Sequence, residues 1–87
     1  MTMKRGGLAK LTEECGEVVQ VCAKADQVDG LDNAHWSGSL RAMLELELGD
    51  LYAAMAFVID THKLNLTRIQ MQRDEKLRLF NLWENES

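Results

Sequence analysis

The sequence contains no proline, one tyrosine, two phenylalanines and two tryptophans among its 87 residues. The lack of proline and the scarcity of β-branched residues, beside abundant Leu, Ala, Glu, Met and Arg, favour helix over strand throughout. Chains divide into several domains only beyond roughly 250 residues. We therefore expect a single all-α domain over residues 1–87.

Long apolar runs and cysteine pairs are also missing. No apolar run approaches the roughly 20 residues that span a membrane, and no apolar segment of signal-peptide type follows the basic N-terminus. Cys15 and Cys22 would lie about 10.5 Å apart on one helix, too far for a disulfide. We expect core thiols in a reducing compartment, and hence a cytoplasmic protein that binds no membrane.

Basic residues are scarce in the middle of the chain. Between residues 13 and 60, ten acidic residues stand against two bases, Lys24 and Arg41, so this segment has a net charge of −8. Binding to a nucleic-acid backbone requires a basic face. The acidic middle argues against nucleic acid as a partner and favours a cation site.

Apolar residues recur at helical spacing in three segments. The first segment covers about residues 8–25, the second about 39–63, and the third, a basic closing helix, about 68–83. A loop of about a dozen residues separates the first two. Thr67 with Gln70 has the form of a capping box for the third helix, and Leu66 with Met71 has the spacing of a hydrophobic staple. The expected inward faces are Leu8, Leu11, Cys15, Val18, Val19 and Cys22; Leu40, Leu44, Leu48, Leu51, Met55, Val58 and Ile59; and Ile69, Leu77, Phe80 and Trp83.

So short a chain buries only about 60–65% of its unfolded surface, which makes a monomer marginal. We expect oligomerisation to complete the three helices into a core like that of a four-helix bundle.

One pattern occurs twice, as ECGE at residues 14–17 and as ELGD at 47–50. Each copy places two carboxylates one helical turn apart, where they can hold a cation between them. Each copy also contains a glycine that costs a helix about 1 kcal/mol relative to alanine. Gly16 and Gly49 could let the two helices approach closely, so that the four carboxylates converge.

Glu47 strengthens this interpretation because it shares its helical row with apolar residues. A core-facing carboxylate needs a counter-charge, and oxygen-only ligands select hard ions such as Mg²⁺, which commonly bridges carboxylates to phosphates. The plain alternative stays open, since ExxE and ExxD patterns also occur on solvated helix faces.

These motifs resemble those of the MazG-like all-α nucleoside triphosphate pyrophosphohydrolases, which carry EExxE on one helix and ExxD on a later one. The surrounding segments LAKLTEECGEVVQVCAKA, LELELGDLYAAMAFVID and RDEKLRLFNLW are similar to the two motif helices and the closing helix of short phage and bacterial members. The likeness covers about residues 8–83. The 29 residues between Glu17 and Glu47 slightly exceed the usual spacing, which leaves the path of the loop and the base pocket open.

The resemblance implies Mg²⁺-dependent hydrolysis between the α- and β-phosphates of a nucleoside triphosphate, with deoxynucleotides as expected substrates, Mn²⁺ as a possible substitute metal, and a homodimer or homotetramer. The activity would be that of a hydrolase acting on acid anhydrides. The implied metal ligands and catalytic residues are Glu14, Glu17, Glu47 and Asp50. Glu13 matches the first motif glutamate but points about 100° away from Glu14, so an outer, water-orienting role is equally open.

Cations for the phosphates must come from elsewhere, and the candidates are Lys24, Arg73 and Lys76. Trp36, beside His35 in the loop, is a candidate for stacking on a base, with anchoring of the loop as the alternative. We interpret His62 as a helix C-terminal residue.

Two other functions stay open. One is phosphoribosyl-ATP pyrophosphohydrolase, which shares related acidic helices. The other is a non-catalytic helical module that dimerises through its apolar stripes and uses its acidic face to bind a partner or a structural ion.

Overall fold

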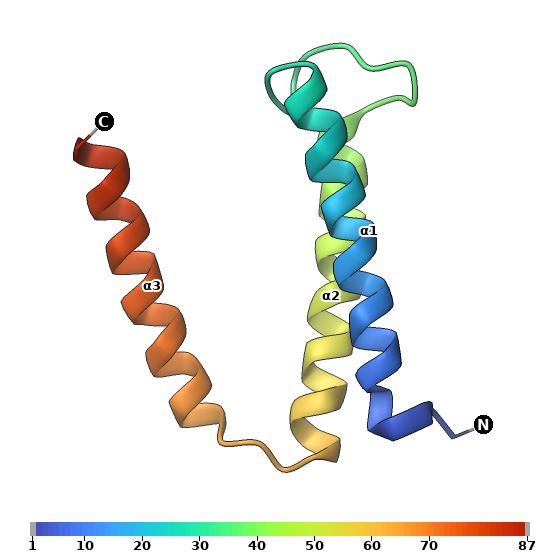
Figure 1. The fold of residues 1–87 in the computed structure, drawn as a ribbon, viewed down its shortest axis with the longest axis vertical. Helices are drawn as coiled ribbons and strands as arrows, with labels where there is room; N and C mark the ends of the chain where they lie inside the picture. Colours follow the sequence, from blue (N-terminus) through green and yellow to red (C-terminus); the bar gives the residue numbers. More distant parts are fainter. Residues whose placement is uncertain (1, 87) are drawn as a thin grey trace.

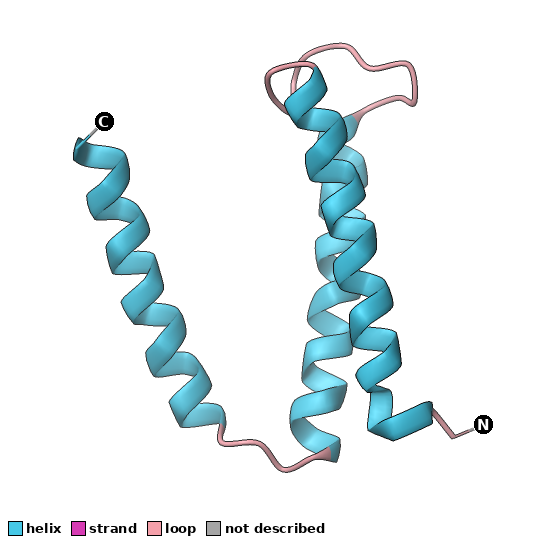
Figure 2. Cartoon of the chain, viewed as in Figure 1, coloured by secondary structure: helices cyan, strands magenta, loops and turns pink. Residues whose placement is uncertain are grey.

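The computed structural model describes residues 2–86, almost all of them helical (Figure 1). A short 3₁₀ turn, η1 (Lys4–Gly7), leads into α1 (Leu8–Gln27), followed by α2 (Leu40–Thr61) and α3 (Leu66–Glu86). Figure 2 shows only helices and loops over these residues, which confirms the all-α prediction. None of the described helices is long and apolar enough to cross a membrane.

Side-chain caps set the starts of α2 and α3. Ser39 Oγ accepts a hydrogen bond from the Ala42 amide at 3.2 Å, so α2 begins where the sequence predicts. The start predicted for α3 is wrong. Asn65 Oδ1 accepts from the Arg68 amide at 3.0 Å, which makes Asn65 the N-cap and places Thr67 inside the helix. Asparagine is at least as good a cap as threonine, and it comes first along the chain.

The first two helices form an antiparallel hairpin whose facing residues recur every three or four positions, as in a coiled coil (Figure 1). We call these buried and half-buried residues the seam. Two of its positions are occupied by glutamates, Glu14 and Glu47. The seam consists of Leu11, Glu14, Val18, Val21 and Ala25 from α1 and Leu40, Leu44, Glu47, Leu51, Ala54 and Val58 from α2.

The predicted inward face of α1 is only partly right. Leu11 and Val18 lie in the seam, but an outer stripe of four apolar residues is exposed. Three of the four follow a seam position by one residue, which turns them about 100° around the helix. The prediction that both cysteines are core thiols is therefore wrong, because both are free and exposed. Two apolar stripes run side by side on α1, and only one of them can face α2. The outer stripe consists of Leu8, Cys15, Val19 and Cys22.

α3 leans away from the hairpin and has no buried residue (Figure 1). Ile69 is half-buried, whereas Leu77, Phe80 and Trp83, predicted to face inward, are at least half exposed. A groove of about 460 Å³ separates α3 from α2, and exposed Leu48 and Met55 line it. The inward prediction is wrong for these three residues because α3 leans away from the hairpin, so the groove between α3 and α2 stays open.

Candidate metal centre

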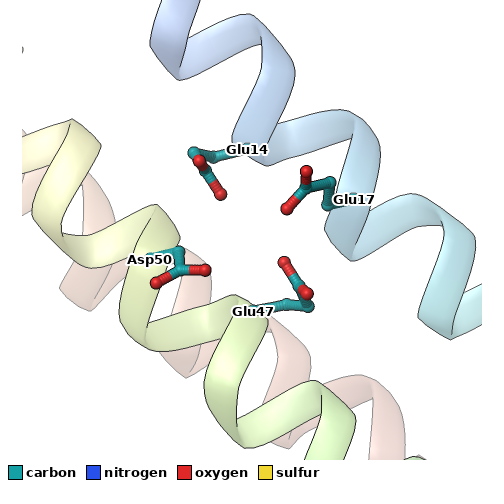
Figure 3. A group of neighbouring side chains, drawn as sticks. All are labelled: Glu14, Glu17, Glu47 and Asp50. Atoms are coloured by element: carbon teal, nitrogen blue, oxygen red, sulfur yellow. The ribbon is translucent and has the colours of Figure 1, made fainter.

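Four carboxylates meet between α1 and α2 (Figure 3). Glu14 and Glu17 project from one helix and Glu47 and Asp50 from the other, and one oxygen of each lies within 4.8 Å of the others. The seam explains this arrangement, since Glu14 and Glu47 occupy seam positions and each companion lies one turn further on the same side. The convergence expected from the sequence is therefore present, and we call these four residues the carboxylate quartet.

Burial of the quartet is uneven. Glu14 is only 6% exposed, and its Oε2 has no hydrogen-bond partner among the described residues. Glu47 is half-buried, and its Oε2 is likewise without a partner. Leaving a buried polar group unsatisfied costs about 1–3 kcal/mol, and more for a charge. Glu17 is half-buried and Asp50 is exposed, so the quartet also opens to solvent.

Repulsion among the quartet acts on the pKa of Glu17. A hydrogen bond with the Glu47 carboxyl, followed by the negative charge of Glu47, raises the pKa of Glu17 above its ordinary value. Two carboxyls this close favour holding a proton between them, and a cation can take the place of that proton.

Lys10 is the cation nearest the quartet. Its Nζ lies 3.3 Å from Glu14 Oε1 and 3.3 Å from Glu13 Oε1, and hydrogen bonds to Glu13 and then Glu14 raise the pKa of the ammonium group. The structure leaves Glu13 outside the quartet, on the exposed side of α1. Glu13 is linked to the quartet by Lys10, which contacts both Glu13 and Glu14, and its negative charge also contributes to the raised pKa of Glu17.

The explanation offered for the two motif glycines is wrong. A Cβ built at Gly16 or at Gly49 meets no atom within 4 Å. Both glycines point away from the seam, so neither is needed to bring α1 and α2 together. The quartet converges because Glu14 and Glu47 share the seam.

The candidate substrate-binding residues lie in two places. Lys24 shares a pocket with Glu17 and Glu47, and its Nζ lies 5.9 Å from the ring centre of Trp36, which is 89% exposed. Arg73 pairs with Asp74 at 2.9 Å on α3, where Lys76 is also exposed. Neither of these α3 cations lines the pockets at the quartet.

Sequence reasoning missed two contacts, the ion pair of Lys10 with Glu14 and the contact of His62 with the N-terminal turn. Lys10 precedes Glu14 by one turn, a spacing that signals an ion pair. His62 closes the base of the hairpin, because its Nε2 lies 3.2 Å from the carbonyl oxygens of Arg5 and Gly6. A contact between positions more than fifty residues apart leaves no signal in a single sequence.

Comparison of the chain with protein-family models, with curated proteins and with solved structures finds no match. The membership suggested by the two motifs stays a prediction, and the candidate function depends on the quartet and its surroundings.

Proposed function

We propose that this protein is a Mg²⁺-dependent nucleoside triphosphate pyrophosphohydrolase of the MazG-like type, acting on deoxynucleotides. The observation that carries the proposal is the carboxylate quartet, in which Glu14 is buried with one oxygen unpartnered. Exposed acidic clusters are common without an ion, but a carboxylate this deeply buried beside three others needs a counter-charge.

The donor set fits a hard divalent ion. All four candidate ligands offer oxygen, and no histidine or cysteine joins them among the described residues. Oxygen donors suit Mg²⁺ and Mn²⁺ better than Zn²⁺. Glu14, Glu17, Glu47 and Asp50 would hold the ion. When bound, Mg²⁺ supplies neutralisation of phosphate oxygens and activation of a water molecule.

The reaction balances as hydrolysis of one anhydride bond. A P–O bond forms from the water oxygen, one P–O bond of the α–β bridge breaks, and its electron pair leaves with the bridging oxygen. A nucleoside monophosphate and pyrophosphate result. The chain's own part is to accept the proton that water loses, for which the carboxylates are the available bases, and to offset the charge of the leaving pyrophosphate with lysine or arginine.

Assembly into a homodimer or homotetramer belongs to the same proposal. The outer stripe of α1 and the apolar residues of α3 are exposed in one chain, and Val21, Leu40, Ala54 and Val58 are its only buried hydrophobic side chains among the described residues. A second copy would cover these faces. It is also a route by which Arg73 or Lys76 of one copy would approach the quartet of the other. The two free thiols fit a reducing compartment such as the cytoplasm.

One observation favours a second candidate, the non-catalytic helical module. α3 exposes Leu77, Phe80 and Trp83 along one helix, as a partner-binding helix would. In such a module the quartet would hold only a structural ion, so we rank it second.

The experiment is a panel of ribo- and deoxynucleoside triphosphates together with phosphoribosyl-ATP, incubated with the protein in Mg²⁺ or in chelator. Chromatography separates monophosphate with pyrophosphate from diphosphate with phosphate. We expect Mg²⁺-dependent monophosphate and pyrophosphate from deoxynucleotides. Exclusive turnover of phosphoribosyl-ATP would support the related enzyme, and no turnover by folded protein would favour the helical module.

A further inference from the structure

Two pockets flank the carboxylate quartet and share it as a common wall. The first is lined by Glu14 and Asp50, and the second by Glu17 and Glu47. Both have volumes within or near the range of small-molecule sites, at about 460 Å³ and 340 Å³. A ligand that touches all four carboxylates therefore extends into both pockets, along the axis of the hairpin.

The first pocket, which we call the apolar pocket, is walled by Met3, Ala53, Ala54 and Phe57, with Lys10 at its edge. Apolar and aromatic walls favour binding of a ring that is buried away from water, such as a nucleobase, and they offer no hydrogen-bond donor to a phosphate.

The wall of this pocket is held in place by the N-terminal turn. Phe57 packs directly over Gly7, where φ is +89° and an added Cβ would lie 2.7 Å from Phe57 Cδ1. Arg5 and Gly6 also have positive φ, and the His62 ring holds both of their carbonyl groups. Gly6 and Gly7 adopt this left-handed conformation without steric cost, whereas Arg5 carries a side chain and is costly there unless its surroundings fix it. The turn thus places Met3 and the Phe57 ring next to Glu14 and Asp50.

The second pocket, which we call the lysine pocket, has a more polar lining that includes Gln20 and Lys24. Lys24 forms no ion pair within residues 2–86, and its ammonium group lies over the Trp36 ring. Lys10, at the apolar pocket, is already paired with Glu13 and Glu14. Of the two lysines beside the quartet, Lys24 is the one available to a phosphate.

We propose that the two pockets orient the substrate: the apolar pocket takes the nucleoside against Phe57, and the lysine pocket takes the terminal phosphates at Lys24. This inference rests on the proposed function. It places the α-phosphate over the quartet and the departing pyrophosphate beside Lys24. It also moves Trp36 from the base end, where the sequence placed it, to the phosphate end.

Binding measurements test this orientation without turnover. The probes are an α,β-methylene deoxynucleoside triphosphate, whose bridge resists hydrolysis, and inorganic triphosphate, which has no base; both are titrated by calorimetry with Mg²⁺ present. Phe57→Ala should weaken the nucleotide analogue by about 10-fold or more and leave triphosphate affinity within about 2-fold, because only the nucleoside buries area on the ring. Lys24→Gln should weaken both probes by similar factors.

Matched controls keep the result specific. Leu46→Ala removes an apolar side chain of α2 that lies outside both pockets, and Lys63→Gln removes an exposed cation, so neither should change either affinity. Phe57→Leu retains most of the packing against Gly7 and serves if Phe57→Ala fails to fold.

Several outcomes would overturn the orientation. They are equal weakening of both probes by Phe57→Ala, selective loss of the nucleotide analogue in Lys24→Gln, and a wild type that binds triphosphate as tightly as the nucleotide analogue. If the wild type hydrolyses nucleotides while one of these results holds, the orientation alone is wrong. If the wild type binds neither probe, the proposed function fails together with it.

Discussion

The α1–α2 hairpin and α3 distribute their apolar and charged residues in opposite ways. The hairpin buries a seam and places two glutamates within it, whereas α3 buries nothing and exposes its aromatics and its leucines other than the half-buried Leu79. Carboxylates in a seam lower stability, so their presence there indicates a function that needs them. Exposed apolar residues along a helix indicate a surface that another chain covers. The hairpin therefore contains the candidate metal site, and α3 contains the candidate interface for a second chain.

The largest expected effect follows from removing one charge of the quartet. Glu47→Gln preserves shape and should lower nucleotide turnover by at least about 100-fold, because it replaces one carboxylate oxygen of the proposed metal site with an amide nitrogen. Thermal stability without metal should stay equal or rise, because repulsion with Glu17 is lost. Turnover and melting are measured on the same preparation. Glu45→Gln, on the exposed side of α2, is the matched control and should keep full activity.

Divalent metal should stabilise the hairpin through the same residues. At a Mg²⁺ concentration 100 times its dissociation constant, linkage predicts about 2.7 kcal/mol, or a rise in Tm of roughly 10–20 °C for a domain of this size. Chelator should reverse the rise. Melting curves of the Glu14→Gln variant should respond far less, and an equal response in that variant would place the ion elsewhere.

Assembly through α3 is tested by charging its apolar face. Phe80→Glu should shift the protein from an oligomer to a monomer and reduce its helix content, because most of the stability of a helix in a protein comes from packing of its apolar face. Light scattering gives the mass and circular dichroism the helicity. Asn81→Glu adds the same charge at a neighbouring exposed position and should leave the mass unchanged. A monomeric wild type would contradict the assembly.

The sequence was sufficient to predict the three helices and the convergence of the quartet. Helical periodicity is local, and Glu47 sits visibly within a row of leucines, so both features can be inferred without tertiary information. The inward face of α1 could not be chosen, because its two apolar stripes are equivalent until a partner helix is placed. The pocket wall at Phe57 was equally hidden, since it depends on His62 reaching a turn at the other end of the chain.

The N-cap of α3 should contribute about 1 kcal/mol to the stability of that helix. Asn65→Ala removes the side chain that accepts from the Arg68 amide and should destabilise α3 by about that amount. Thr67→Ala should cost only a few tenths of a kcal/mol or nothing, because alanine is the better helix former inside α3. Hydrogen exchange of the first α3 amides compares the two variants. A greater loss of protection in Thr67→Ala than in Asn65→Ala would show that Thr67 is the N-cap, as the capping box predicted.

The smallest expected effect is on the stability of the hairpin, when each of the two motif glycines is replaced by alanine. Because a Cβ at Gly16 or Gly49 meets nothing within one chain, Gly16→Ala and Gly49→Ala should each raise the stability of the hairpin by about 0.5–1 kcal/mol. Chemical denaturation measures this gain. If either alanine instead lowers oligomer mass or nucleotide affinity while the helices stay intact, that glycine faces a second copy or the substrate. The glycine would then be needed for contact with a second copy or with the substrate, and not for the packing of α1 on α2.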